Sequence, residues 1–149
     1  MRPYLVLSFL FFVGLSAQAQ IYSPVSWTFD AEKISDTEYY LQFHADIDKG
    51  WVVYSQYISD EGPVPTGFFY ESPKDLVLVG KNEEIGHKKE TYDKLFDMEL
   101  IKLSGAVLFK QKVKVPAGKK SVSGYLTFMT CDDEKCLPPT DVDFTITLP

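Results

Sequence analysis

The sequence of 149 residues has almost no arginine, because Arg2 is the only one and lysine supplies every other strong positive charge. Acidic residues outnumber lysine and arginine by 21 to 15, which gives a formal net charge of −6. Proteins that bind nucleic acid carry basic patches, and anionic membrane surfaces also attract basic segments. The composition therefore argues against nucleic acid and against anionic membrane surfaces as partners.

Long hydrophobic runs are also scarce, and the one strongly apolar run lies at the N-terminus. Leu5–Leu15 is almost wholly apolar, and residues 17–19 read Ala-Gln-Ala, a small-x-small pattern typical of a signal-peptide cleavage site. The run is too short for a permanent transmembrane helix. We therefore expect residues 1–19 to be a signal peptide and residues 20–149 to be one exported domain without stable membrane insertion.

Helical periodicity and internal repeats are missing, and strand patterns dominate instead. Residues 37–47 alternate between apolar and polar side chains, with Tyr39 and Phe43 on the apolar side. Phe109 and Phe144 fall on the inward-facing side of similar segments further along. Turn residues recur about every 8–12 residues and separate roughly eight or nine short strands. This pattern predicts an all-β fold, an immunoglobulin-like antiparallel β-sandwich.

One segment between the predicted strands has no regular periodicity. Lys81–Lys94 is polar and contains Gly86 and His87. We expect it to be a long loop, and loops of that length in a compact domain often have a functional role.

Cysteine is rare as well: the chain has only Cys131 and Cys136, separated by Asp-Asp-Glu-Lys. Two lone cysteines in an oxidising compartment usually pair. A disulfide across so short a loop stabilises a fold by only about 2 kcal/mol, so a structural disulfide and a redox-active one both remain open. The expected position, an exposed hairpin between strands, favours the redox-active pair, because a partner can reach the sulfurs there. The acidic residues between the cysteines disfavour a thiolate and predict a slow nucleophile.

Other catalytic and ligand-binding patterns are absent. His44 and His87 do not have the spacing to the cysteines that a zinc site requires. Asp132–Glu134 lacks the spaced oxygen ligands of a calcium loop. The sequence has no Gly-x-Ser-x-Gly elbow and no phosphate-binding glycine loop. We therefore expect no metal site.

The cysteine segment resembles a known family. Residues 124–139, GYLTFMTCDDEKCLPP, resemble the N-terminal periplasmic domain of DsbD, the thiol:disulfide interchange protein, in an aromatic-rich strand, two nearby cysteines and a Pro-Pro pair directly after the second. Residues 50–56, GWVVYSQ, resemble its Gly-aromatic-x-x-Tyr segment, and residues 92–97, YDKLFD, resemble its cap loop. The cysteine spacing is one residue shorter than in well-known members. The sequence also stops before the further domains of full-length DsbD, so we expect a stand-alone or truncated form.

The resemblance implies a periplasmic thiol–disulfide exchange domain. Such a domain takes electrons from a DsbD-like membrane reductase and passes them to periplasmic thioredoxin-fold proteins, which serve disulfide isomerisation or cytochrome c biogenesis. In that case Cys136 forms the mixed disulfide with partners, Cys131 resolves it, and no cofactor is needed because the sulfurs carry the electrons. The domain would be an electron-transfer component of a protein-disulfide reductase rather than a complete enzyme.

The resemblance also implies a cap loop that covers the disulfide with an aromatic side chain. Phe96 is the best match for that aromatic, with Leu95, Asp93 and Tyr92 in the same loop. Tyr54 is expected either in the sandwich core or, as the resemblance implies, near the site. The alternative, from a different class, is a non-catalytic β-sandwich interaction domain with a structural disulfide.

Overall fold

The computed structural model describes residues 22–149, so the expected signal peptide, residues 1–19, lies outside them. Within the described residues the chain forms nine strands and one turn of 3-10 helix, η1 (Pro73–Asp75). The strands are β1 (Val25–Lys33), β2 (Glu38–Ile47), β3 (Val52–Tyr54), β4 (Gly67–Tyr70), β5 (Val77–Asp93), β6 (Met98–Lys114), β7 (Ser121–Phe128), β8 (Thr130–Cys131) and β9 (Thr140–Thr147).

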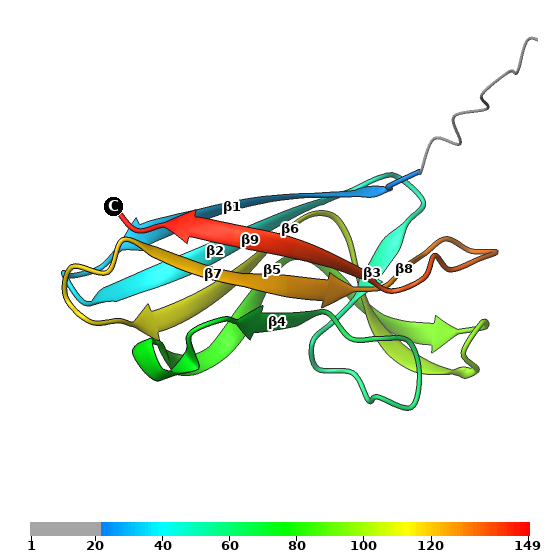
Figure 1. Cartoon of the computed structure of the whole chain (residues 1–149). Helices are drawn as coiled ribbons and strands as arrows, with labels where there is room; N and C mark the ends of the chain where they lie inside the picture. The colour runs from blue at the N-terminus through cyan, green and yellow to red at the C-terminus, as the bar shows by residue number, and fades with distance from the viewer. Residues whose placement is uncertain (1–21) are drawn as a thin grey trace, which may run out of the picture.

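The strands form two antiparallel sheets that pack face to face (Figure 1). The larger sheet has the order β1-β2-β6-β3-β8, and β5 pairs with the other side of β6. The smaller sheet has the order β4-β7-β9 and is the green-to-red layer in front in Figure 1. The expected all-β, immunoglobulin-like antiparallel β-sandwich is confirmed.

Aromatic side chains join the two sheets in the core. The alternating side chains of β2 are buried as the sequence predicts, and Phe43 of β2 lies directly opposite Phe109 of β6. The ring centroid of Phe43 lies 5.0 Å from that of Phe144 in the smaller sheet and 4.4 Å from that of Phe68. Ring pairs at such separations add to the stability that apolar burial supplies.

The expectation of a long loop over Lys81–Lys94 is wrong, because this segment belongs to β5 and pairs with β6 as far as Asp93. β5 is an outer strand whose side chains are mostly exposed, so burial imposes no alternation on its sequence. Register irregularities after Val79 and after Gly86 interrupt the pattern further. The charged side chains of β5 are typical of a sheet edge that must not pair with another chain.

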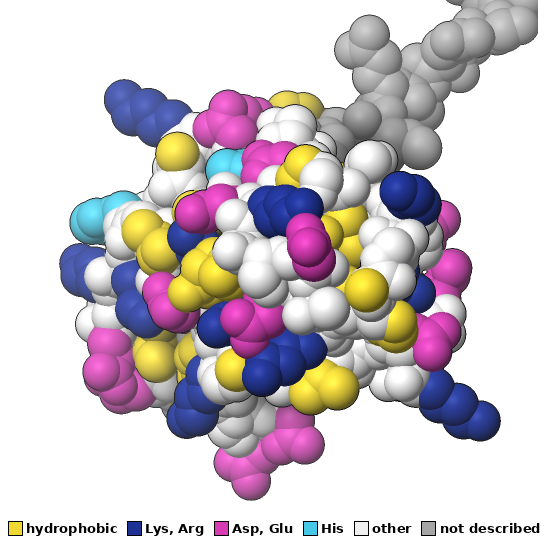
Figure 2. Space-filling model, turned by 90° about the vertical axis from the view of Figure 1, so that its left-hand side faces the viewer, with side chains coloured by type: hydrophobic (Ala, Val, Ile, Leu, Met, Phe, Trp, Pro, Cys, Tyr) yellow, Lys and Arg dark blue, Asp and Glu magenta, His cyan; other side chains and the backbone are white. Residues whose placement is uncertain are grey.

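The β5–β6 hairpin and the cysteine hairpin (residues 131–136) lie at the same end of the sandwich (Figure 1). Figure 2 shows the opposite end, where lysine and acidic side chains are interspersed and form no large area of one sign. In the part of the chain that the structure describes, no helix is long and apolar enough to cross a membrane.

Gly124 of β7 lies between β4 and β9 in the smaller sheet, where the two neighbouring strands leave no room for a side chain. A Cβ at this position would overlap the carbonyl oxygen of Phe69 and lie 2.8 Å from Cζ of Phe144. Forced overpacking of this kind typically costs about 1–3 kcal/mol, so we expect Gly124→Ala to lower the free energy of unfolding by at least that amount in urea titrations. Ser123→Ala on the same strand is the control and should change it by less than about 0.5 kcal/mol. Equal unfolding midpoints for the two variants would contradict this packing.

Candidate functional site

The chain changes sheets immediately before the first cysteine. β7 of the smaller sheet ends at Phe128, and β8 then pairs with β3 in the larger sheet, where Cys131 lies opposite Val52. The Thr130 hydroxyl donates a hydrogen bond of 2.9 Å to the carbonyl oxygen of Val52 and fixes this crossing. Cys131 is therefore only 1% exposed, and the expectation that both cysteines lie in an exposed hairpin loop is wrong for it. Cys136 is half-buried.

The two cysteines form a disulfide with Cα atoms 4.0 Å apart. The turn between them is held by Asp132, whose Oδ1 accepts 2.8 Å hydrogen bonds from the N–H groups of Glu134 and Lys135. These backbone hydrogen bonds lower the pKa of Asp132. A carboxylate therefore stays ionised beside Cys131, as the sequence suggested, and disfavours a thiolate there.

The disulfide lies in a small apolar cluster on the outer face of the larger sheet, separate from the sandwich core. On β3, Val53 points into the core, so its neighbours Val52 and Tyr54 point to the other face. We call this group the disulfide cluster; its members are Tyr54, Leu100, Cys131, Val52, Ile58, Phe96, Met98, Met129 and Cys136.

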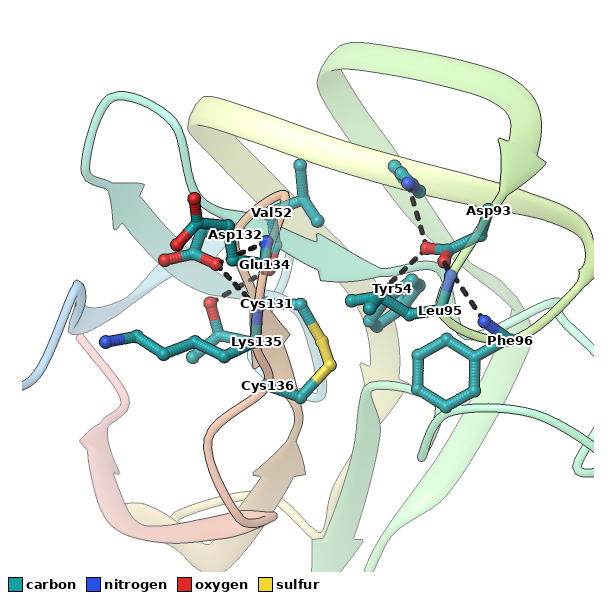
Figure 3. The surroundings of a disulfide bond; sticks show 12 residues. Val52, Tyr54, Asp93, Leu95, Phe96, Cys131, Asp132, Glu134, Lys135 and Cys136 are labelled. Carbon is teal, nitrogen blue, oxygen red and sulfur yellow. Dashed lines mark hydrogen bonds and ion pairs between the residues drawn. A yellow bond between two sulfur atoms is a disulfide. The ribbon is translucent and has the colours of Figure 1, made fainter.

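Phe96 covers the disulfide cluster from the tip of the β5–β6 hairpin. Figure 3 shows its ring facing the disulfide, with Tyr54 behind it on β3. The two rings meet edge to face, with centroids 5.9 Å apart and an interplanar angle of 82°. The structure thus brings together four of the residues expected at the site: Cys131, Cys136, Tyr54 and Phe96.

Asp93 lies at the end of β5, and its side chain is only 3% exposed. Its carboxylate holds this arrangement through four hydrogen bonds. Its Oδ1 accepts the N–H groups of Leu95 at 2.8 Å and Phe96 at 3.3 Å. Its Oδ2 accepts the Tyr54 hydroxyl at 3.1 Å and the Lys102 ammonium at 2.9 Å. Burial acts to raise the pKa of Asp93, but Lys102 and the two backbone N–H groups outweigh it and hold this pKa below its usual value. Burial and the Asp93 charge raise the pKa of Tyr54, which keeps its hydroxyl a donor.

The other two residues expected in the cap loop face solvent. Leu95 is 46% exposed and Tyr92 is 50% exposed, and neither belongs to the disulfide cluster. The Tyr92 hydroxyl donates to the carboxylate of Asp97, the residue that turns the chain back into β6 with φ 57°. From here on, "cap loop" means residues 94–97, between β5 and β6.

Sequence reasoning missed two charged residues that build the site. Lys102 lies directly opposite Tyr54 across the β3–β6 pair. The Glu84 side chain is fully buried, and its carboxylate accepts the Ser55 hydroxyl at 2.9 Å and the Gln56 N–H at 2.8 Å. Glu84 thereby anchors the loop after β3, whose Ile58 packs on the disulfide cluster. The sequence predicts a loop over Lys81–Lys94, so it gives no signal that Glu84 and Asp93 meet these partners.

A groove of about 460 Å³ runs between the cap loop and the cysteine hairpin. Its lining residues are Thr91, Tyr92, Asp93, Lys94, Leu95, Lys102, Asp132 and Asp133. A partner that binds in this groove contacts the cysteine hairpin and the cap loop together.

The two histidines lie apart from this site. His44 of β2 shares a hydrogen bond of 2.8 Å with Asp30 of β1, and His87 lies in β5 opposite Ser104. Between residues 22 and 149, no group of three or more His, Cys, Asp or Glu side chains has a geometry that could hold a metal ion.

Comparison with solved structures shows that the fold of this chain is similar to that of two known domains. The N-terminal domain of DsbD from Neisseria meningitidis, in the reduced form, is 19% identical, with a TM-score of 0.50 over 81% of this chain and 84% of that one. The N-terminal periplasmic domain of ScsB from Proteus mirabilis is 18% identical, with a TM-score of 0.52 over 81% of this chain and 44% of that one. No protein-family model and no curated protein sequence matches. The resemblance to the DsbD N-terminal domain is thus confirmed at the level of the fold.

Phe96 packs against the disulfide cluster and lies beside the disulfide (Figure 3), which predicts that its ring limits access to the sulfurs. We expect Phe96→Ala to speed reduction of the oxidised protein by dithiothreitol several-fold, followed by alkylation of the new thiols and mass spectrometry. Leu95→Ala is the matched control, since that side chain faces solvent in the same loop, and its rate should equal that of the wild type. If both variants react at the wild-type rate, Phe96 does not shield the disulfide.

The lowered pKa of Asp93 predicts a pH dependence of stability. A carboxyl group whose pKa is lower in the folded state contributes fully above its unfolded pKa, about 3.9, and this contribution is lost as the pH falls through the folded pKa. We expect Asp93→Asn to lower the free energy of unfolding by about 2 kcal/mol at pH 7, the range for hydrogen bonds to charged groups. In urea titrations this difference should persist down to about pH 5 and shrink below about pH 4. A difference that grows on acidification would contradict the assignment.

Proposed function

We propose that this protein is a periplasmic thiol–disulfide exchange module that works through Cys131 and Cys136. The observation that carries the proposal is the placement of the disulfide: it lies under Phe96 on the outer face of the larger sheet, with Cys136 the less buried cysteine. The likeness of fold to the N-terminal domains of DsbD and ScsB supports it. A disulfide that served only to close its own hairpin would have no need of a separate apolar cover.

In the proposed cycle, a dithiol of the electron donor reduces the oxidised pair. A donor thiolate attacks Sγ of Cys136, the bond to Cys131 breaks, and Cys131 leaves as a thiolate. The second donor thiol then attacks the mixed disulfide, so that the donor becomes a disulfide and the pair gains two electrons. Delivery runs in reverse: the Cys136 thiolate attacks the disulfide of an acceptor, and Cys131 then attacks Cys136 and releases the acceptor as a dithiol. No cofactor takes part in these steps.

The proposed electron donor is a DsbD-like membrane reductase, and the proposed acceptors are periplasmic thioredoxin-fold proteins of disulfide isomerisation or cytochrome c biogenesis. Residues 1–19, as a signal peptide, would deliver the domain of residues 20–149 to that compartment. Within this scheme the protein is an electron-transfer component of a protein-disulfide reductase.

The second candidate is a non-catalytic β-sandwich interaction domain with a structural disulfide. The observation that favours it is the burial of Cys131 in a strand of the larger sheet. It predicts that the disulfide resists thioredoxin-fold proteins. It also predicts that replacing both cysteines costs only about 2 kcal/mol of stability, the value for so short a loop.

Trapping of mixed disulfides separates the two candidates. We expect reduced Cys131→Ala, mixed with an oxidised thioredoxin-fold protein, to accumulate a mixed disulfide through Cys136, visible on a non-reducing gel and located by mass spectrometry. Cys136→Ala is the matched control and should trap far less, because Cys131 is buried. Trapping by neither variant would refute the exchange function, and equal trapping by both would refute the roles given to the two cysteines.

A further inference from the structure

We propose that Lys102 is a positioning residue for the disulfide, because its ammonium group neutralises the buried Asp93 carboxylate that holds the cap loop closed. This inference rests on the proposed thiol–disulfide exchange for its biological meaning. The contacts that carry it are those of Lys102, Asp93 and the cap loop.

The pairing of β3 with β6 puts Lys102 in this position. Lys102 and Tyr54 are direct cross-strand partners, so their side chains point to the same outer face of the larger sheet. Both side chains end at Oδ2 of Asp93, the ammonium at 2.9 Å and the hydroxyl at 3.1 Å. The Lys102 side chain is only 22% exposed, and among the residues that the structure describes it is the one cation in ion-pair contact with Asp93.

The remaining groups around Asp93 do not supply a compensating charge at contact distance. Tyr54 of β3 and the N–H groups of the cap loop are neutral donors. Lys94 also lines the groove, but it forms no ion pair with Asp93. Asp132 and Asp133 line the opposite side of the same groove and add negative potential. Without Lys102, the Asp93 carboxylate would therefore be a buried charge facing further carboxylates.

A buried carboxylate that loses its counter-charge takes up a proton at a higher pH. A protonated Asp93 carries a hydrogen on one oxygen, so it can no longer accept all four of its hydrogen bonds. Loss of the bonds to the N–H groups of Leu95 and Phe96 frees the cap loop, and the ring of Phe96 then leaves the disulfide. Lys102 thus keeps the cap loop closed over the whole pH range in which exchange takes place.

The test measures the rate at which dithiothreitol reduces the disulfide between about pH 5 and pH 8, the range around neutrality in which an uncompensated buried carboxyl titrates. The rate of each variant is divided by the rate of the wild type in the same solution, and this quotient is the rate ratio. The ionisation of the reductant affects both rates equally and therefore cancels in the rate ratio. Lys102→Met keeps the apolar stem and removes the charge. We expect its ratio to rise as the pH falls and to reach about tenfold, which corresponds to about 1.4 kcal/mol. Lys102→Arg keeps the charge and should restore a ratio near one.

The Asp93→Asn background shows whether Lys102 acts through Asp93. The ratio of Asp93→Asn should be raised and independent of pH over this range, and adding Lys102→Met should leave it unchanged. A pH-independent ratio for Lys102→Met, or the same effect of Lys102→Met in the Asp93→Asn background, would overturn the proposal. If Lys102→Met does not fold, as judged by circular dichroism, Lys102→Gln replaces it with the same expectations.

This assay uses a small thiol and no partner protein. A failure of the exchange function in the trapping experiment therefore leaves the role of Lys102 standing, and a pH-independent ratio leaves the exchange function standing. The two proposals can fail separately.

Discussion

The site depends on one buried carboxylate, that of Asp93. Burying a charge is costly unless hydrogen bonds and an opposite charge compensate it, and Asp93 has both. Because its four partners come from β3, β6 and the cap loop, the strands and the tip of the hairpin must meet in one geometry to satisfy it. This requirement places Phe96 over the disulfide, whereas apolar contact alone would leave a tip of four residues many alternative positions.

A second carboxylate on the same strand acts in a similar way. The Glu84 side chain is fully buried and accepts hydrogen bonds from Ser55 and Gln56 directly after β3, so it fixes the loop that carries Ile58. β5 thus holds the two segments that pack on the disulfide cluster. Asp93 holds the cap loop, and Glu84 holds the loop after β3. An edge strand that contributes little to the core therefore has the larger part in shaping the site.

The burial of each strand explains what the sequence could and could not predict. The alternation in β2 placed Phe43 correctly, because one face of that strand is buried and the apolar pattern records it. β5 is exposed on most of both faces, so its sequence records no strand pattern and predicts a loop instead. The family resemblance located Cys131, Cys136, Tyr54 and Phe96 together. The burial of Cys131 was missed because the change of sheet between Phe128 and Thr130 leaves no mark in an otherwise continuous strand pattern.

The change of sheet makes the two sulfurs unequal. Cys131 belongs to a strand that is hydrogen-bonded to β3, and the Thr130 hydroxyl ties the residue before it to Val52, so its position is set by the larger sheet. Cys136 follows a turn whose hydrogen bonds lie within the hairpin itself, at Asp132. Attack on a disulfide depends on access to the sulfur that is attacked, and Cys136 is the less buried of the two cysteines. In the proposed exchange cycle, Cys131 would stay within reach of Cys136 and would resolve the mixed disulfide before a second partner competes for it.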